Sequence, residues 1–134
     1  MRFLGVDWGS KRVGLAVADH DTFAVPLRTI ERRPNIMETI RREIEAEEVD
    51  EIVMGLPINM DGTEGPAALR VRQAAKDLSS HCQKPVHLWD ERLSSFEAEQ
   101  RLLDAGAGPK KSRAVVDQLA AAVILQSFLD ARAT

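Results

Sequence analysis

The chain has 134 residues, of which 44% are hydrophobic and 29% are charged, and its net charge at pH 7 is −3. This length predicts one domain over residues 1–134, large enough to bury a hydrophobic core. No apolar segment approaches the ~20 residues of a membrane span, and the single cysteine, Cys82, excludes a disulfide framework. The N-terminus has no signal-peptide pattern, so we expect a cytoplasmic protein.

The first third of the sequence predicts three antiparallel strands. Two apolar runs, residues 2–7 and 12–19, are joined by a short polar linker that suits a hairpin turn. A third run, residues 24–31, follows the polar break at 20–22. Pro26 indicates that this strand lies at an edge of the sheet, because proline cannot donate a hydrogen bond to a neighbouring strand.

Helices and strands alternate in the rest of the chain. The predicted elements are a helix from Pro34 with Ile36, Ile40 and Ile44 at helical spacing, a strand over 51–56, a helix after the 57–65 loop with Ala68, Val71, Ala75 and Leu78, a strand over 86–89, a helix from Ser94 to about Gly106, and a helix over about 112–131. The last helix is apolar nearly all round, which predicts an interior position. Three antiparallel strands followed by two helical crossovers predict an α/β domain with added parallel strands and covered sheet faces.

Acidic residues stand at the carboxyl ends of strands, where α/β sheets bind their ligands. Asp7 ends the first strand, and Asp90 and Glu91 follow the last one. Asp117 lies within the apolar C-terminal helix, on a face with small residues such as Ala121 that allow a close approach to the sheet. We therefore predict that Asp117 faces the sheet, although an aspartate near a helix start can also simply favour the helix dipole.

Clustered carboxylates indicate a metal site. Two such charges ~4 Å apart repel by about 4 kcal/mol at an effective dielectric of 20, and a divalent cation reverses the sign. A set of oxygen donors without Cys or an H-x-x-x-H pattern suits Mg²⁺ or Mn²⁺ rather than zinc. We predict two such ions and phosphodiester chemistry, with the metal activating a water and stabilising the leaving oxygen. Because adjacent strand residues face opposite ways, this reasoning does not decide between Asp90 and Glu91.

Basic and polar residues at the same edge of the sheet are candidates for contacts with nucleic acid. They are Lys11, Arg12, Asn59, Thr63, Lys110, Lys111 and Arg113. The net charge argues against one large basic face, so binding would depend on such local clusters. Each also has a structural interpretation, since paired basic residues are usually solvated surface and Asp61-Gly62 indicates a turn with Thr63 as a helix cap.

The two tryptophans each neighbour a proposed acidic ligand. Trp8 follows Asp7, and Trp89 precedes Asp90. Stacking against a nucleic-acid base is one interpretation. Core packing is favoured, because strand positions accommodate large apolar rings.

Four sequence blocks resemble the motifs of the YqgF family, small bacterial proteins of the ribonuclease H-like (RuvC-resolvase-like) superfamily. The blocks follow in order over nearly the whole chain: GVDWGSKRVGLAVAD, IVMGLPINMDGTEG, DERLSSFEAEQRL and VDQLAAAVILQSFLD. The resemblance implies a ribonuclease H-like fold, with three antiparallel and two parallel strands and helices on both faces. It also implies an acidic metal site at Asp7, Glu91 and Asp117. The family is described both as Holliday-junction resolvases and as nucleases that mature the 5′ end of pre-16S ribosomal RNA.

The sequence therefore predicts a metal-dependent nuclease that acts on structured nucleic acid, with pre-16S rRNA as the favoured substrate. A resolvase of branched DNA stays open; a two-fold symmetric junction calls for a homodimer, whereas an RNA-processing enzyme can act as a monomer. A non-catalytic RNA-binding module for ribosome assembly is a further alternative. Asp-x-Gly before a hairpin also opens the sugar-kinase, Hsp70 and actin ATPase fold, but that fold needs two such domains and we expect this chain to be too short.

Overall fold

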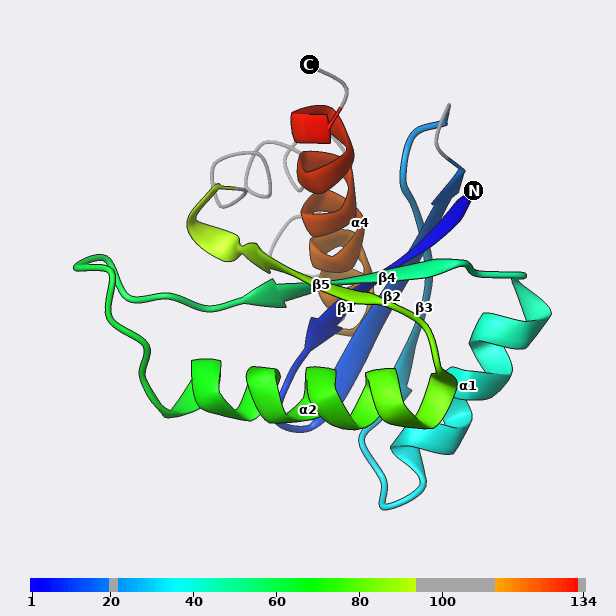
Figure 1. Ribbon diagram of the computed structural model, residues 1–134, viewed down its shortest axis with the longest axis horizontal. Helices are drawn as coiled ribbons and strands as arrows, with labels where there is room; N and C mark the ends of the chain where they lie inside the picture. Colours follow the sequence, from blue (N-terminus) through cyan, green and yellow to red (C-terminus); the bar gives the residue numbers. More distant parts are fainter. Residues whose placement is uncertain (20–21, 94–112, 133–134) are drawn as a thin grey trace.

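A five-stranded mixed sheet forms the centre of the computed structural model, which describes residues 1–19, 22–93 and 113–132. Its strands are β1 (Arg2–Trp8), β2 (Arg12–Asp19), β3 (Val25–Glu31), β4 (Glu51–Leu56) and β5 (Val86–Asp90). They lie in the order β3-β2-β1-β4-β5 (Figure 1). The pairs β1–β2 and β2–β3 are antiparallel, whereas β1–β4 and β4–β5 are parallel. The predicted arrangement of three antiparallel and two parallel strands is confirmed.

The edge position predicted for the strand with Pro26 is confirmed as well, because β3 is the outermost strand on its side. Pro26 pairs with Ala16 directly after an irregularity in the register between Leu15 and Ala16. Such an irregularity accommodates a residue that has no N–H group to donate. The helix predicted from Ser94 lies outside the described residues.

Helices cover both faces of the sheet. They are α1 (Ile36–Ala46), α2 (Pro66–Cys82) and α4 (Arg113–Arg132), and a short 3-10 helix, η1 (Glu91–Leu93), follows β5. In Figure 1, α1 and α2 lie on one face of the sheet and α4 crosses the other. None of the helices in the described ranges combines the length and the apolar character needed to cross a membrane.

Alternate strand residues belong to two separate cores. Leu4 and Val6 of β1 join the core under α1 and α2, together with Ile40 of α1. Phe3 of the same strand joins the core under α4, together with Leu125. Because side chains alternate along a strand, this pattern places Asp7 on the α4 face and Trp8 on the opposite face.

Helix α4 approaches the sheet so closely that two strand positions have room only for glycine. A Cβ atom on Gly14 would lie 2.1 Å from the carbonyl oxygen of Asp117, and one on Gly5 would lie 2.7 Å from that of Ala121. The backbone of α4 therefore rests directly on β1 and β2. This contact brings the fifth residue of α4, Asp117, to the sheet edge where β1 ends.

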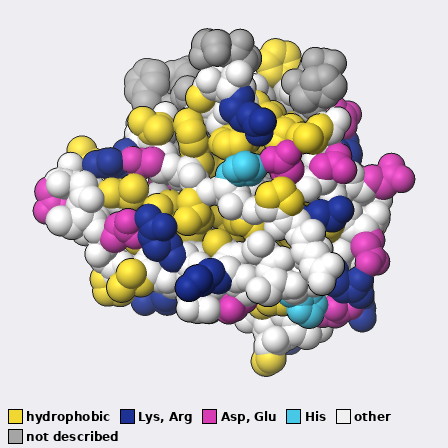
Figure 2. Space-filling model, viewed as in Figure 1, with side chains coloured by type: hydrophobic (Ala, Val, Ile, Leu, Met, Phe, Trp, Pro, Cys, Tyr) yellow, Lys and Arg dark blue, Asp and Glu magenta, His cyan; other side chains and the backbone are white. Residues whose placement is uncertain are grey.

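Charges of both signs are interspersed over the face of the molecule shown in Figure 2. Lys and Arg side chains alternate there with Asp and Glu, and among the described residues this face shows no extended basic patch. This distribution agrees with the net charge of −3.

Candidate active site

The three predicted metal-binding acids come from three different elements on the α4 side of the sheet. Asp7 pairs across the β1–β2 ladder with Gly14, and directly opposed residues share one face of a sheet. A Cβ on Gly14 would meet the backbone of Asp117, so the side chain of Asp7 lies on the same face as this part of α4. On β4, a Cβ on Gly55 would lie 2.7 Å from Oε1 of Glu91, which shows that the Glu91 side chain occupies the space above this glycine.

The Asp7 carboxyl is held in surroundings that disfavour its charge. Burial, and after it the negative charges of Glu91 and Asp117, raise its pKa to about 7. Burial and the charge of Asp90 also raise the pKa of Glu91. A partly buried carboxyl group with like charges near it is a candidate functional residue.

Asp90 lies in different surroundings from its neighbour Glu91. Its carboxylate accepts hydrogen bonds from the backbone N–H of Arg92 at 2.9 Å and from Nη2 of the same residue at 2.7 Å. The hydrogen bonds from the Arg92 side chain, and with them the one from its backbone N–H, lower the pKa of Asp90. Of the two acids that sequence reasoning could not separate, Glu91 therefore interacts electrostatically with Asp7, and Asp90 is neutralised by an arginine.

Asp117 is paired with a cation from the protein itself. Nε of Arg12 on β2 donates to Oδ2 of Asp117 at 2.9 Å, with 32% of the arginine side chain and 24% of the aspartate side chain exposed. In this arrangement the described residues contain no group of three or more His, Cys, Asp or Glu side chains that could hold a metal ion. The charges of Glu91 and Asp117 nevertheless both act on the Asp7 carboxyl.

This donor set fits a magnesium-type ion. Mg²⁺ is commonly bound through only one or two carboxylates, with waters and substrate phosphates completing its shell. Asp7 and Glu91 supply two such carboxylates, and Asp117 would join them once Arg12 releases it. All three are hard oxygen donors, which Mg²⁺ and Mn²⁺ favour.

An open cavity of about 550 Å³ is lined by two of the acidic residues, Asp90 and Glu91. Its lining includes Glu91, Arg92 and Leu93 from η1 together with Pro57 and Ile58 from the loop after β4. Arg92 was missed by sequence reasoning, although it directly follows the two acids in the sequence. Its wall carries two carboxyl groups, Asp90 and Glu91, and one arginine that is paired with Asp90, so a phosphate could enter only together with a bound cation.

The loop after β4 is closed by its own side chains. Nδ2 of Asn59 donates to Oγ1 of Thr63 at 3.0 Å, and that hydroxyl donates to Asp61 at 2.6 Å. The turn predicted at Asp61-Gly62 is present, with Gly62 at φ 88°. The prediction of Thr63 as a helix cap is wrong, because α2 begins at Pro66 with Gly65 at the cap position. Proline fixes the first turn there without needing a polar cap.

The other predicted nucleic-acid contacts are only partly described. Lys11 is exposed at the turn between β1 and β2, next to Arg12. Arg113 is the first residue of α4. Lys110 and Lys111 lie outside the described residues.

Trp89 packs in the core under α4, as the core-packing interpretation predicts. Its ring makes an edge contact with Phe128, with centroids 5.7 Å apart, and its Nε1 donates to the hydroxyl of Ser127 at 3.0 Å. An indole with its donor satisfied and its ring packed has a structural role.

Comparisons with known proteins agree with this architecture. The family model described as "RuvX: Holliday junction resolvase" matches residues 1–131. A protein of Anaeromyxobacter sp. (strain K) named "Putative pre-16S rRNA nuclease" is 48% identical and covers 99% of both chains. A protein of Geobacillus sp. (strain WCH70) with the same name is 45% identical, covering 98% of this chain and 99% of its own. The solved structure of Thermus thermophilus RuvC in complex with a Holliday junction substrate is similar in fold, with a TM-score of 0.65, 14% identity and coverage of 99% and 96%.

These findings agree on one class of enzyme, a nuclease, which hydrolyses ester bonds of nucleic acid. The fold alone would not identify an activity, but the family match and the identity extend along almost the whole chain. The protein therefore belongs to the RuvX family, described as Holliday junction resolvases.

Proposed function

We propose that the protein is a divalent-metal-dependent nuclease that cleaves structured RNA and matures the 5′ end of pre-16S rRNA in the cytoplasm. The observation that carries this proposal is the electrostatics of Asp7, whose partly buried carboxyl is destabilised as an anion by burial and by the charges of Glu91 and Asp117. The choice of RNA is supported by the names of relatives that are nearly half identical over the whole chain.

In this proposal, Asp7 and Glu91 hold the divalent cation, Mg²⁺ or Mn²⁺, and Asp117 completes a site for a pair of ions. A bound cation supplies an activated water and charge stabilisation for the leaving oxygen. The protein itself positions the acidic residues and the substrate. The pairing of β1 with β2 fixes the backbone position of Asp7, opposite Gly14.

Cationic side chains around the acids would position the phosphodiester. Arg92 lines the cavity next to Glu91, and it also donates to the backbone oxygen of Asn59 at 3.3 Å. Lys11 and Arg12 lie at the turn between β1 and β2, directly after the strand that ends with Asp7 and Trp8. In this proposal these cations contact the phosphate backbone and fix its register relative to the acids. Asn59, Thr63, Lys110, Lys111 and Arg113 remain proposed contacts of the same kind.

Cleavage of a four-way DNA junction is the second candidate function. It is favoured by the description of the matching family and by the fold likeness to RuvC bound to its junction. Because a four-way junction has two-fold symmetry, this activity calls for a homodimer with two paired sites.

One preparation of protein tests both functions. Precursor 16S rRNA and a four-way DNA junction are incubated separately with Mg²⁺, with Mn²⁺ and with EDTA, and the products are mapped. We expect cleavage of the RNA near the mature 5′ end with either metal and none in EDTA. Cleavage of the junction alone would favour the resolvase, and cleavage in EDTA would contradict a metal mechanism. Binding of the RNA without cleavage under every condition would favour the non-catalytic alternative.

A further inference from the structure

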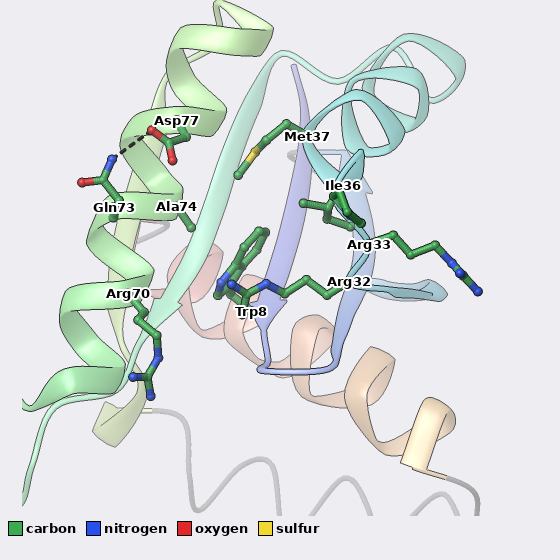
Figure 3. A pocket seen from close by; sticks show the side chains of 10 residues that line it. Trp8, Arg32, Arg33, Ile36, Met37, Arg70, Gln73, Ala74 and Asp77 are labelled. Carbon is green, nitrogen blue, oxygen red and sulfur yellow. Dashed lines mark hydrogen bonds between the residues drawn. The ribbon is translucent and has the colours of Figure 1, made fainter.

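A second groove lies on the face of the sheet opposite the acidic residues. Its volume is about 480 Å³, and Trp8 from the end of β1 lies within it (Figure 3). Residues that follow β3 and the first turn of α1 form one wall, and α2 forms the other. The lining residues are Trp8, Arg32, Arg33, Pro34, Ile36, Met37, Arg70, Gln73, Ala74 and Asp77. Nothing in the proposed catalytic reaction uses this groove.

The groove lies at the same edge of the sheet as the acidic residues. Trp8 and Asp7 are consecutive on β1, and their side chains project to opposite faces of the strand. The hairpin turn with Gly9 and Lys11 separates the two sites. A polymer that passes over this turn can therefore contact both.

The groove carries excess positive charge. Its two walls contribute Arg32, Arg33 and Arg70, against one acid, Asp77, which already accepts a hydrogen bond from Gln73 at 2.9 Å. Arg33 is engaged in an ion pair with Glu31 and extends away from the groove in Figure 3. Within residues 1–19, 22–93 and 113–132, neither Arg32 nor Arg70 forms an ion pair with a carboxylate. Two arginines at one groove without acidic partners form a site for anions.

The centre of the groove is aromatic and apolar. The Arg32 guanidinium lies 4.9 Å from the centroid of the Trp8 ring and donates to the backbone oxygen of Gly9 at 3.2 Å. Met37 and Ala74 add apolar surface on either side. Nε1 of Trp8 is buried and has no hydrogen-bond partner in the described part of the chain. Buried donors are normally satisfied, so this indole N–H lacks the partner that such a group usually has.

We propose that this groove binds a single-stranded segment of the nucleic-acid substrate, a few nucleotides away from the bond that is cut. The inference rests on the proposed function for its ligand class. A base lies against Trp8 and Met37, and Arg32 and Arg70 contact the flanking phosphates. A volume of about 480 Å³ is within the range of small-ligand pockets, roughly 300–1,000 Å³, which suits a nucleotide and is too small for a duplex. Stacking on an aromatic ring with arginines on the backbone is how single strands are commonly bound.

Binding is tested in EDTA, where no cleavage interferes, with a fluorescently labelled ten-nucleotide oligouridylate as the probe. Anisotropy gives its Kd for the unchanged protein and for the Arg32→Ala, Arg70→Ala and Arg42→Ala variants. Arg42 is the matched control, since it is an exposed arginine of α1 outside the groove. We expect the Kd to rise about tenfold for each groove variant and to stay unchanged for Arg42→Ala. The slope of log K against log salt should fall by about 0.7 for each lost phosphate contact.

The location of the probe is tested through Trp8 itself. In a Trp89→Phe background Trp8 is the single tryptophan, and the oligouridylate should quench its fluorescence. A duplex of the same length and inorganic phosphate should leave that fluorescence unchanged. Equal quenching by inorganic phosphate would show that the groove binds small anions and not a nucleic-acid strand. Equal Kd values for Arg42→Ala and Arg70→Ala would show that the groove does not bind the oligouridylate.

The two proposals fail separately. Asp7→Asn should abolish cleavage while leaving the Kd of the oligouridylate unchanged in EDTA. If Arg70→Ala leaves the Kd of the oligouridylate unchanged while the unchanged protein still cleaves RNA, only the proposal for the groove is wrong. If the unchanged protein cleaves no substrate but Arg70→Ala still raises the Kd of the oligouridylate, only the nuclease proposal is wrong.

Discussion

Arg12 and Asp117 form an ion pair across the contact between β2 and α4, with Nε and Oδ2 2.9 Å apart. The two residues are 105 positions apart in the sequence, so the pair forms only when α4 docks on the sheet. The pair joins Asp117, a proposed metal ligand, to Arg12, a proposed contact of the substrate phosphates. Binding of a divalent cation at Asp117 and release of Arg12 toward substrate would therefore be one exchange.

Replacing Arg12 with Gln should strengthen metal binding in the absence of nucleic acid. Asp117 then has no internal cation to give up, and we expect the Kd for Mn²⁺ to fall about threefold, since a partly exposed pair of this kind contributes at most about 1 kcal/mol. Isothermal titration calorimetry measures this change. The control is Arg28→Gln, which breaks an ion pair with Glu43 away from the acids. Equal Kd values for both variants and the unchanged protein would show that Arg12 does not compete with the metal.

The stability of the metal-free protein should depend on pH through Asp7. The folded protein keeps a proton on Asp7 up to about pH 7, whereas the unfolded chain loses it near pH 3.8. The folded state therefore binds more protons in this range, and the free energy of unfolding falls as pH rises from about 4 to about 7. Asp7→Asn should remove this contribution and stabilise the metal-free protein at pH 8 by roughly 2 kcal/mol, a value lowered for partial exposure.

Urea unfolding at pH 5 and pH 8 in EDTA measures the Asp7 effect. The variant should be more stable than the unchanged protein at pH 8, and the difference should shrink at pH 5. Mg²⁺ should stabilise the unchanged protein at pH 8 and have a much weaker effect on Asp7→Asn. A variant that is less stable at pH 8 would contradict the repulsion described for this site.

The adjacent acids Asp90 and Glu91 should respond differently to removal of their charges. Glu91→Gln should lower kcat/KM by about a hundredfold or more, because it removes a proposed metal ligand. Asp90→Asn should lower it less than about tenfold, because it disturbs only the pairing with Arg92. Cleavage kinetics at saturating Mg²⁺ compare the two variants. A larger loss of kcat/KM for Asp90→Asn would indicate that Asp90, and not Glu91, is the metal ligand.

Gly14 should tolerate no side chain. A methyl group there would lie 2.1 Å from a backbone oxygen of α4, so the helix must move, and we expect Gly14→Ala to cost about 3 kcal/mol or more and to abolish cleavage. Gly62→Ala is the control, because a Cβ at Gly62 meets nothing within 4 Å. Its positive φ should cost about 1 kcal/mol without loss of activity. Denaturant unfolding and a cleavage assay on both variants check this prediction.

Sequence reasoning succeeded where local periodicity carries the information. The five strands and the spacing of Ile36, Ile40 and Ile44 follow from hydrophobic patterns, because burial of one face imposes them. Pro26 at the edge follows from its missing N–H. These features depend on residues that are close together in the sequence.

Features that depend on tertiary contacts could not be predicted from the sequence. The pairing of Arg12 with Asp117 joins segments that no local pattern connects. The closeness of α4 depends on Gly5 and Gly14, which in the sequence are only two glycines within apolar strands. Thr63 was predicted as a cap from its residue type, but the chain runs on to Pro66 before it enters the helix.

The backbone contact between α4 and the sheet has a consequence for sequence variation. The separation between the strand that carries Asp7 and the helix that carries Asp117 is set by main-chain atoms at Gly14, and interlocking side chains do not determine it there. The layer of α1 and α2 packs on the opposite face of the sheet and takes no part in this contact. Changes in that layer, including the wall beside Trp8, can therefore alter what the groove binds without changing the main-chain contact between α4 and β2.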